Sequence, residues 1–371
     1  MESNGLPESW TELPFPKAAQ RVRSKGATIR ASEYMPAGKI PIVDQGQQLI
    51  AGFTDDEATK FQGPLPIVVF GDHTREVKFV DFDFAVGADG TVLLKPDSRI
   101  DPLFFFYWLK SATLHKLGYS RHAKLLAEQV VRFPVLPAEQ RRIATRITAL
   151  ARRSQEVRKL TASLVEDMSH ILQAEYDRIT TGVSSKPFSE AAKLVRRWVK
   201  AKPEEDYPET GIRSFGKGTF HKPTLTGERL GNKRICRIKA GDLVFMNVFA
   251  WEGAIAVARP EDDDRVASHR FMMHEVLPNQ ATAEFLCYYF LTERGLEHIR
   301  GASPGSAGRN RTLGITKLEE IPVPVPPIEE QRRFAKLCKL HYQLQRLQQE
   351  TEAELVSFTP ALLAKAFRGE L

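Results

Sequence analysis

Hydrophobic and polar positions divide the chain into four blocks: two regions of short apolar runs, each followed by a long stretch with helical spacing. In the first region, β-branched and aromatic runs at 67–70, 77–80 and 91–94 are separated by Gly- and Asp-containing turns and predict strands. An aromatic run at 102–109, with Leu114 and Leu117, predicts a buried helix. The second region repeats this plan, with strands at 241–245 and 253–258 and a helix at 283–291.

Each region ends in a strand-like strip containing prolines, at 133–137 and 321–327, and a long helix follows. Each helix opens with a proline and with glutamates in its first turn, which suits the unpaired N–H groups and positive end of a helix. Apolar residues then recur at near-heptad spacing, which predicts a narrow seam that needs a partner, most economically the other helix. The seam of the first helix is Ile143, Ile147, Leu150, Val157, Leu164, Met168 and Ile171, with Ser154 and Thr161 between them; that of the second is Leu337, Leu340, Leu344, Leu347, Leu355, Phe358 and Leu362, interrupted by Thr351.

The helix entrances are a repeat, because Pro-Ala-Glu-Gln-Arg-Arg at 137–142 returns as Pro-Ile-Glu-Glu-Gln-Arg-Arg at 327–333. Aligning Glu139 with Glu330 gives an offset of 191 residues. This period is far longer than the roughly 20–50 residues of solenoid repeats. The chain is therefore expected to be two half-molecules in tandem, with a pseudo-symmetric ligand or partner.

Composition is that of a globular protein, with 371 residues, 42% hydrophobic and 27% charged. No run has the ~18 apolar residues of a membrane helix, and the N-terminus lacks signal-peptide features, so we expect a cytoplasmic protein with no membrane partner. Cys236, Cys287 and Cys338 are far apart and predict buried thiols rather than disulfides or a metal site. The net charge of +7 is spread thinly, which fits DNA binding within a larger complex but also fits an ordinary basic protein.

The order of region, helix, region, helix, with Pro-Val-Leu-Pro-Ala-Glu-Gln at 134–140, Pro-Val-Pro-Pro-Ile-Glu-Glu-Gln at 324–331 and a closing segment at 362–371, resembles the specificity subunit of type I restriction-modification systems. The resemblance covers essentially the whole chain. It implies an α+β, pseudo-two-fold protein in which two mixed α/β target recognition domains alternate with two long helices that pair as an antiparallel coiled coil. The implied domains are 1–133 and 183–321, and the implied helical segments are 134–182 and 322–371.

The resemblance further implies a non-catalytic subunit that reads a bipartite, asymmetric site in double-stranded DNA. Two methyltransferase subunits would dock on the helices and their entrances, and restriction or translocase subunits would join in some complexes. This chain would carry no cofactor; S-adenosylmethionine, and ATP with Mg²⁺ for a motor subunit, would be bound by partners. The implied docking residues are Pro137, Glu139, Gln140, Pro327, Glu330 and Gln331.

Candidate DNA contacts lie in polar loops, because amide side chains pair with adenine and guanidinium groups with guanine or phosphate. The candidates in the first domain are Gln45, Gln47, Gln48, Arg75, Arg121, His122 and Lys124. Those in the second domain are Arg213, Lys217, His221, Lys222, Arg270, Arg309, Asn310 and Arg311. For most of them a solvated surface role is an equal alternative.

Other interpretations are less favoured. Asp72 and Glu76, followed by Lys78, only loosely resemble a metal-dependent nuclease site, since two carboxylates this close do not come from separate strands. The aromatic run at 104–108 is expected in the core, and the acidic run at 261–264 is expected to be a solvated loop tip. The alternatives that remain are a protein-binding scaffold and an autonomous endonuclease.

Overall fold

A computed structural model describes residues 7–24, 28–87, 90–112, 123–305 and 311–371. The chain divides into two compact units: unit 1 comprises Met1–Leu160 and Glu350–Leu371, and unit 2 comprises Thr161–Gln349. Each long helix contributes one part to each unit. Leu114 and Leu117, which were expected to extend the first aromatic helix, lie outside the described residues.

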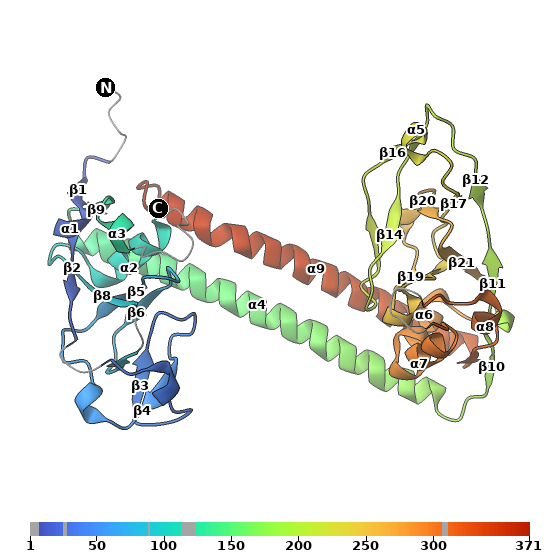
Figure 1. Ribbon diagram of the computed structural model, residues 1–371, viewed down its shortest axis with the longest axis horizontal. Helices are drawn as coiled ribbons and strands as arrows, with labels where there is room; N and C mark the ends of the chain where they lie inside the picture. The colour runs from blue at the N-terminus through green and yellow to red at the C-terminus, as the bar shows by residue number, and fades with distance from the viewer. Residues whose placement is uncertain (1–6, 25–27, 88–89, 113–122, 306–310) are drawn as a thin grey trace. The chain divides into compact units, whose positions relative to one another are not determined.

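Unit 1 is built on an antiparallel four-stranded sheet with helix α2 (Pro102–Ser111) packed on it (Figure 1). The sheet order is β2 (Ala19–Val22), β8 (Thr91–Pro96), β5 (Ile67–Gly71) and β6 (Val77–Val80). A smaller sheet contains β4 (Gly52–Thr54), β3 (Ile40–Val43) and β7 (Ala85–Val86), and β1 (Trp10–Pro14) pairs with β9 (Val130–Pro134). Short helices are α1 (Phe15–Ala18) and α3 (Ala123–Leu126).

The aromatic run of unit 1 lies in the core, as predicted. The Asp101 carboxylate starts α2 by accepting hydrogen bonds from the N–H groups of Leu103 and Phe104, each at 3.0 Å. Phe104 and Phe105 are fully buried among residues of the sheet and of the two long helices. Four predicted elements of this unit, at 67–70, 77–80, 91–94 and 102–109, are therefore confirmed as β5, β6, β8 and α2.

Unit 2 repeats the plan, with α6 (Ala283–Leu291) packed on a four-stranded antiparallel sheet. The sheet order is β11 (Ala192–Val195), β21 (Phe271–Val276), β18 (Leu243–Met246) and β19 (Ile255–Val257). The remaining strands are β12 (Trp198–Val199), β17 (Ile235–Arg237) and β20 (Val266–Ser268) in one sheet, and the pairs β13 (Asp206–Tyr207) with β16 (Leu225–Thr226), β14 (Thr210–Ile212) with β15 (Thr219–His221), and β10 (Ser185–Pro187) with β22 (Pro322–Pro324). Further helices are α5 (Gly227–Leu230), α7 (Glu293–Gly301) and α8 (Ile315–Glu319).

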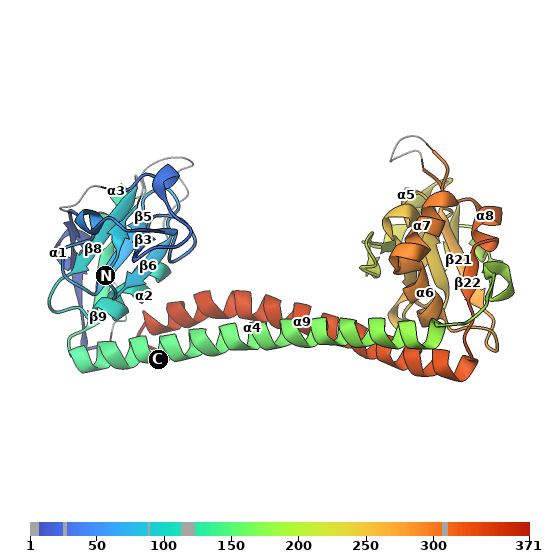
Figure 2. The same ribbon diagram turned by 90° about the horizontal axis from the view of Figure 1, so that it is seen from below.

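The two long helices, α4 (Pro137–Thr180) and α9 (Ile328–Ala366), pack against each other in antiparallel orientation (Figure 2). In unit 1, the beginning of α4 shares a core with the end of α9, through Ile143 and Ile147 on one helix and Leu362 on the other. In unit 2, the end of α4 shares a core with the beginning of α9, through Tyr176 and Phe334, whose ring centroids are 6.0 Å apart. The predicted pairing is confirmed.

The predicted seams are wrong in the middle of each helix. Val157, Leu164 and Ile171 of α4 are exposed, as are Leu340 and Leu347 of α9. The buried residues of α4 beyond its first turns include Ser154, Met168 and Leu172, and Leu172 lies one position after the expected Ile171. The physical reason is that an α-helix has 3.6 residues per turn, so a strict seven-residue stripe drifts by ~20° per heptad around a straight helix.

None of the helices in the described part of the chain combines the length and hydrophobicity that crossing a lipid bilayer requires. Of the three cysteines expected to be buried, Cys236 is fully buried, whereas Cys287 and Cys338 are partly buried; all three are free thiols.

Candidate nucleic-acid interface

The glutamine-rich segment of unit 1 follows β3 and is fixed to the neighbouring turn. The side-chain oxygen of Gln45 accepts a hydrogen bond from the His73 backbone N–H at 3.2 Å, and its backbone carbonyl accepts one from the Thr74 hydroxyl at 2.5 Å. Gln45 is therefore engaged inside the unit rather than presented to a ligand. Gln47 and Gln48, in contrast, are exposed and remain candidates for base contacts.

The other candidates of unit 1 have different settings. Arg75 is half-buried and has a left-handed backbone conformation, with φ of 65°, in the turn that joins β5 to β6. Lys124 is exposed on the short helix α3. Arg121 and His122 lie outside the described residues.

In unit 2, two cations lie over aromatic rings on the β14–β15 hairpin. The Arg213 guanidinium is 4.8 Å from the Phe220 ring centroid, and the Lys217 ammonium is 6.0 Å from that of Phe215. Phe215 has a φ of 62° and is 75% exposed, so the hairpin tip presents an aromatic ring beside a positive charge. Such a pair can stack on a base or contact a phosphate.

His221 and Lys222 are paired with acidic groups. His221 Nε2 is 3.0 Å from an oxygen of Asp262, which also accepts hydrogen bonds from the Thr219 hydroxyl at 2.6 Å and the Arg259 backbone N–H at 2.9 Å. Burial opposes ionisation of Asp262, but the hydrogen bonds from Thr219 and Arg259 outweigh it and lower the pKa of the carboxyl group. The Lys222 ammonium is 2.7 Å from Glu209.

The acidic run at 261–264 therefore requires a correction. Asp262 is fully buried and organises the hairpin, whereas Glu261, Asp263 and Asp264 are exposed as expected. Asp262 could not be distinguished from its exposed neighbours in the sequence, because its hydrogen-bond partner Thr219 lies 43 residues earlier.

Of the remaining candidates of unit 2, Arg270 and Arg311 fall within the described residues. Arg270 is exposed in the turn before β21, and the Arg311 guanidinium lies 5.3 Å from the Trp251 ring centroid. Arg309 and Asn310 lie outside the described residues.

The structure adds a pocket, lined by charged residues of both signs, that was not predicted from the sequence. A pocket of about 450 Å³ in unit 2 has Asn232, Lys233, Arg234 and His269 among its lining residues. The Arg234 guanidinium also lies 4.4 Å from the ring centroid of Trp198, which is partly exposed. The adjacent Lys233 and Arg234 after Gly231 were a weak sequence signal, because the turn and the strands that surround them come together only in the fold.

The expected docking residues divide into two groups. Gln140 and Gln331 are fully buried, so they offer no surface to a partner, and their expected docking role is corrected to an internal one. The Gln140 amide donates hydrogen bonds to the carbonyls of Arg99 and Pro134, at 2.9 and 2.8 Å, and its oxygen accepts one from the Asp101 N–H at 2.7 Å.

The acidic residues of the two entrances lie at the surface of their units and form ion pairs. Glu139 accepts two hydrogen bonds from Arg142, at 2.8 and 2.7 Å. Glu330 is 2.6 Å from Arg178. Pro137 begins α4, and Pro327 immediately precedes α9. These four residues, unlike the two glutamines, remain candidates for partner contacts.

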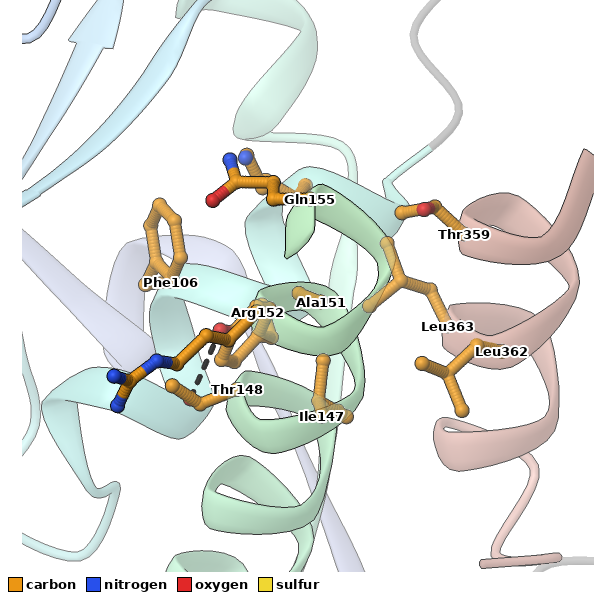
Figure 3. A pocket seen from close by; sticks show the side chains of 11 residues that line it. Phe106, Ile147, Thr148, Ala151, Arg152, Gln155, Thr359, Leu362 and Leu363 are labelled. Carbon is orange, nitrogen blue, oxygen red and sulfur yellow. Dashed lines mark hydrogen bonds between the residues drawn. The ribbon is translucent and has the colours of Figure 1, made fainter. Parts of the chain in front are cut away.

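A second pocket, of about 270 Å³, lies in unit 1 between α2, α4 and α9 (Figure 3). Its walls are apolar at Ile147, Leu362 and Leu363, and Arg152 and Gln155 lie on the same stretch of α4. The Tyr107 hydroxyl is hydrogen-bonded to Thr148 at 2.9 Å and ties α2 to α4. The pocket thus lies where α2 meets the two long helices.

A catalytic metal site is not found among the residues that the structure describes, since no three His, Cys, Asp or Glu side chains there are grouped to hold an ion. Asp72, of the nuclease-like segment, is buried at the end of β5.

Comparison with known proteins finds sequence similarity over part of the chain. Residues 196–356 match the family described as type I restriction modification DNA specificity domain. The chain is 24% identical over 111 residues to the specificity subunit of the Escherichia coli type I restriction enzyme EcoR124I/EcoR124II, a match that spans 29% of this chain and 27% of that relative.

Solved structures share the fold over nearly the whole chain. The S subunit of a type I restriction-modification system from M. genitalium is 16% identical, with a TM-score of 0.60, over 99% of this chain and 98% of that one. A chain from a structure of the type I system that concerns complex assembly and conformational transition is 18% identical, with a TM-score of 0.55, over 99% of both chains. The solved structures thus share the fold of this chain, and the match to the specificity-domain family covers residues 196–356, less than half of the chain.

Proposed function

We propose that this protein is the DNA sequence-recognition subunit of a type I restriction-modification complex and reads a bipartite, asymmetric target. Unit 1 would read one half-site and unit 2 the other, and the paired helices would set the gap between them. The chain itself would carry out no catalysis. The E. coli relative is named as a specificity subunit, which supports this assignment.

The observation that carries the proposal is a repeated scaffold with unlike polar surfaces. Helices α2 and α6 occupy equivalent places, and each is joined to the following long helix through a buried glutamine. The exposed loops differ: unit 1 presents the amides of Gln47 and Gln48, whereas unit 2 presents cation–aromatic pairs such as Arg213 with Phe220. Different surfaces on one scaffold are what reading two different half-sites requires.

We further propose that methyltransferase subunits bind the long helices. Exposed apolar side chains, among them Leu164 and Leu347 in unit 2 and Leu160 and Val356 in unit 1, line these helices outside their paired faces. Apolar surface of this kind on a soluble assembly typically marks a protein interface. S-adenosylmethionine, and ATP with Mg²⁺ where a motor subunit joins, would then be bound by the partner subunits.

The decisive experiment is selection from random DNA duplexes by the chain co-purified with its methyltransferase subunit, followed by sequencing of the retained duplexes. The proposal predicts two specified half-sites separated by a gap of fixed length. An intact complex that retains DNA without any shared motif would contradict it and favour a protein-binding scaffold. Metal-dependent cleavage by the chain alone would favour an endonuclease.

A further inference from the structure

A buried lysine in unit 1 is not accounted for by the scaffold. Lys78 lies on β6 with only 5% of its side chain exposed, on the same face of the strand as the core residue Val80. Lysine is almost never buried without a partner, because removing its charge from water is costly. The groups that Lys78 contacts therefore indicate its role.

Lys78 is bonded to both ends of the short segment 44–48. Its ammonium group lies 3.5 Å from the carboxylate of Asp44, which is 15% exposed, and it donates a hydrogen bond to the backbone carbonyl of Gln48. The pKa of Lys78 is lowered, because the effect of burial outweighs the opposing effect of the neighbouring Asp44 charge. The lysine thus acts as a cross-link between the core of the unit and the loop.

The same loop is fixed at further points. The Asp44 carboxylate accepts hydrogen bonds from the Gly46 N–H at 2.8 Å and from the Tyr34 hydroxyl at 3.3 Å. Burial and the charge of Asp44 raise the pKa of Tyr34 to about 12, so its hydroxyl keeps its proton at neutral pH. With the bonds of Gln45 to the neighbouring turn, these contacts hold the backbone of a surface loop that has no regular secondary structure.

The side chains that this loop presents are uncharged. Gln47, Gln48, Leu49 and Ile50 are all exposed, and the one charge in the segment 44–50, that of Asp44, is paired with Lys78. A loop without Lys or Arg gains little from phosphate groups, because phosphate binding depends on positive charge. In the major groove, a glutamine amide pairs with the N6 and N7 atoms of adenine, and apolar side chains contact the methyl group of thymine.

We propose that residues 44–50 are a base-reading loop of unit 1 that recognises A·T base pairs in the major groove. Gln47 and Gln48 contact adenine, Leu49 and Ile50 contact thymine methyl groups, and Lys78 is a positioning residue that holds the loop in its reading geometry. This inference rests on the proposed function and adds to it the base composition of one half-site.

The first test repeats the duplex selection with Gln47→Ala/Gln48→Ala in the complex with the methyltransferase subunit. One half-site is expected to lose its preference for A·T at one or two positions, by roughly 5- to 100-fold at each. The other half-site, the gap and the salt dependence of binding should stay unchanged, since no phosphate contact is removed. Gln20→Ala, at an exposed glutamine on β2 of the same unit, is the matched control and should change nothing.

The second test concerns Lys78. Lys78→Met leaves Asp44 charged and without its lysine, so it is expected to destabilise the unit; Asp44→Asn/Lys78→Met removes both charges and is expected to fold better. Both variants lose the bond to Gln48 and should relax the same A·T positions without changing the salt dependence. If Lys78 has a purely structural role, the double variant will keep the specificity of the wild type. That result would overturn the positioning role.

The outcomes separate the two proposals. A wild-type motif with two half-sites that Gln47→Ala/Gln48→Ala leaves unchanged would overturn the base-reading loop and leave the specificity function standing. A uniform loss of affinity for all duplexes, with a weaker salt dependence, would assign the loop to the DNA backbone and also overturn the inference. Absence of any motif for the wild-type complex would remove both proposals together.

Discussion

Gln140 and Gln331 are 191 positions apart and make the same set of hydrogen bonds in their two units. Gln140 accepts a bond from the N–H of Asp101, the N-cap residue of α2, and Gln331 accepts one at 3.1 Å from the N–H of Thr282, the N-cap residue of α6. Each amide also donates to two backbone carbonyls, which for Gln331 are those of Gln280 and Pro326. The two glutamines thus join each aromatic helix to the long helix that follows it.

Replacing Gln140 by alanine should destabilise unit 1 without removing any surface that a partner could use. The change leaves one buried N–H and two carbonyls without their partner, so we expect a loss of roughly 2–5 kcal/mol in the free energy of unfolding. Chemical denaturation measures it. Glu139→Ala is the control, because its exposed ion pair with Arg142 should contribute less than about 1 kcal/mol. Normal stability of Gln140→Ala combined with lost methyltransferase binding would instead support a docking role.

The stability of unit 2 should fall at acidic pH because of His274. This histidine is buried, its ring centroid is 5.0 Å from that of Phe188, and neither ring nitrogen has a hydrogen-bond partner among the described residues. Burial lowers the pKa of His274 from 6.5 to about 4, so the unfolded chain binds this proton more readily than the folded one. The free energy of unfolding of unit 2 is therefore unaffected by protonation of His274 above pH 6.5. It decreases as the pH falls toward 4, by at most about 1.4 kcal/mol per pH unit.

His274→Met should remove this dependence while keeping an apolar side chain of similar size in the core. We expect the difference in unfolding free energy between pH 7 and pH 5 to be smaller in the variant than in the wild type. Thermal or denaturant unfolding of both proteins at the two pH values measures it. If the unfolding free energy changes equally between the two pH values in both proteins, His274 does not take up a proton on unfolding in this range.

The exposed apolar residues of the long helices should be needed for complex formation and not for folding. Leu164 and Leu347 are 54% and 55% exposed, so Leu164→Glu or Leu347→Glu should change stability by only about 0.5 kcal/mol. A buried glutamate at a protein interface is costly, and binding of the methyltransferase subunit should fall at least about tenfold. Ser163→Glu adds the same charge at a neighbouring exposed position and serves as the control. Unchanged binding in both leucine variants would place the docking surface elsewhere.

Much of the fold followed from local pattern. Strands β5, β6 and β8 and helices α2 and α6 are rich in β-branched or aromatic residues and are bounded by turn residues, and these signals can be read from the sequence itself. The helix pairing followed from two apolar seams in one chain. The exact paired face did not, because Ser154 and Met168 are buried while Leu164 is exposed, and a stripe with a strict seven-residue repeat drifts by ~20° per heptad around a straight helix.

The candidate site was less predictable because its chemistry depends on contacts between distant residues. Gln140 lies in the first turn of a helix, where the sequence suggests an exposed side chain. It is buried instead, and it bonds to Asp101, which lies 39 residues earlier. Lys78 looked like part of a loosely nuclease-like segment, yet it holds the backbone of Gln48. Sequence composition marks which polar residues exist; the fold decides which of them are already bonded and which are presented to a ligand.

Lengthening both long helices together should widen the gap between the half-sites without changing either half. The Arg158 guanidinium lies 2.9 Å from Glu352 across the antiparallel pair, and Thr161 and Gln349 are the corresponding positions three residues further along. Inserting seven residues after Thr161 and seven before Gln349 adds two helical turns, about 10 Å at ~1.5 Å per residue. At ~3.4 Å per base pair, the selected gap should grow by about three base pairs.

An insertion in α4 alone is the matched control for this prediction. It displaces Tyr176 from its contact with Phe334 on α9, so it should lower stability and DNA binding together. Sequencing of selected duplexes measures the gap in the doubly lengthened protein. Altered half-site sequences at an unchanged gap would show that the helices do not set the spacing, whereas a longer gap between two unaltered half-sites would establish them as the spacer.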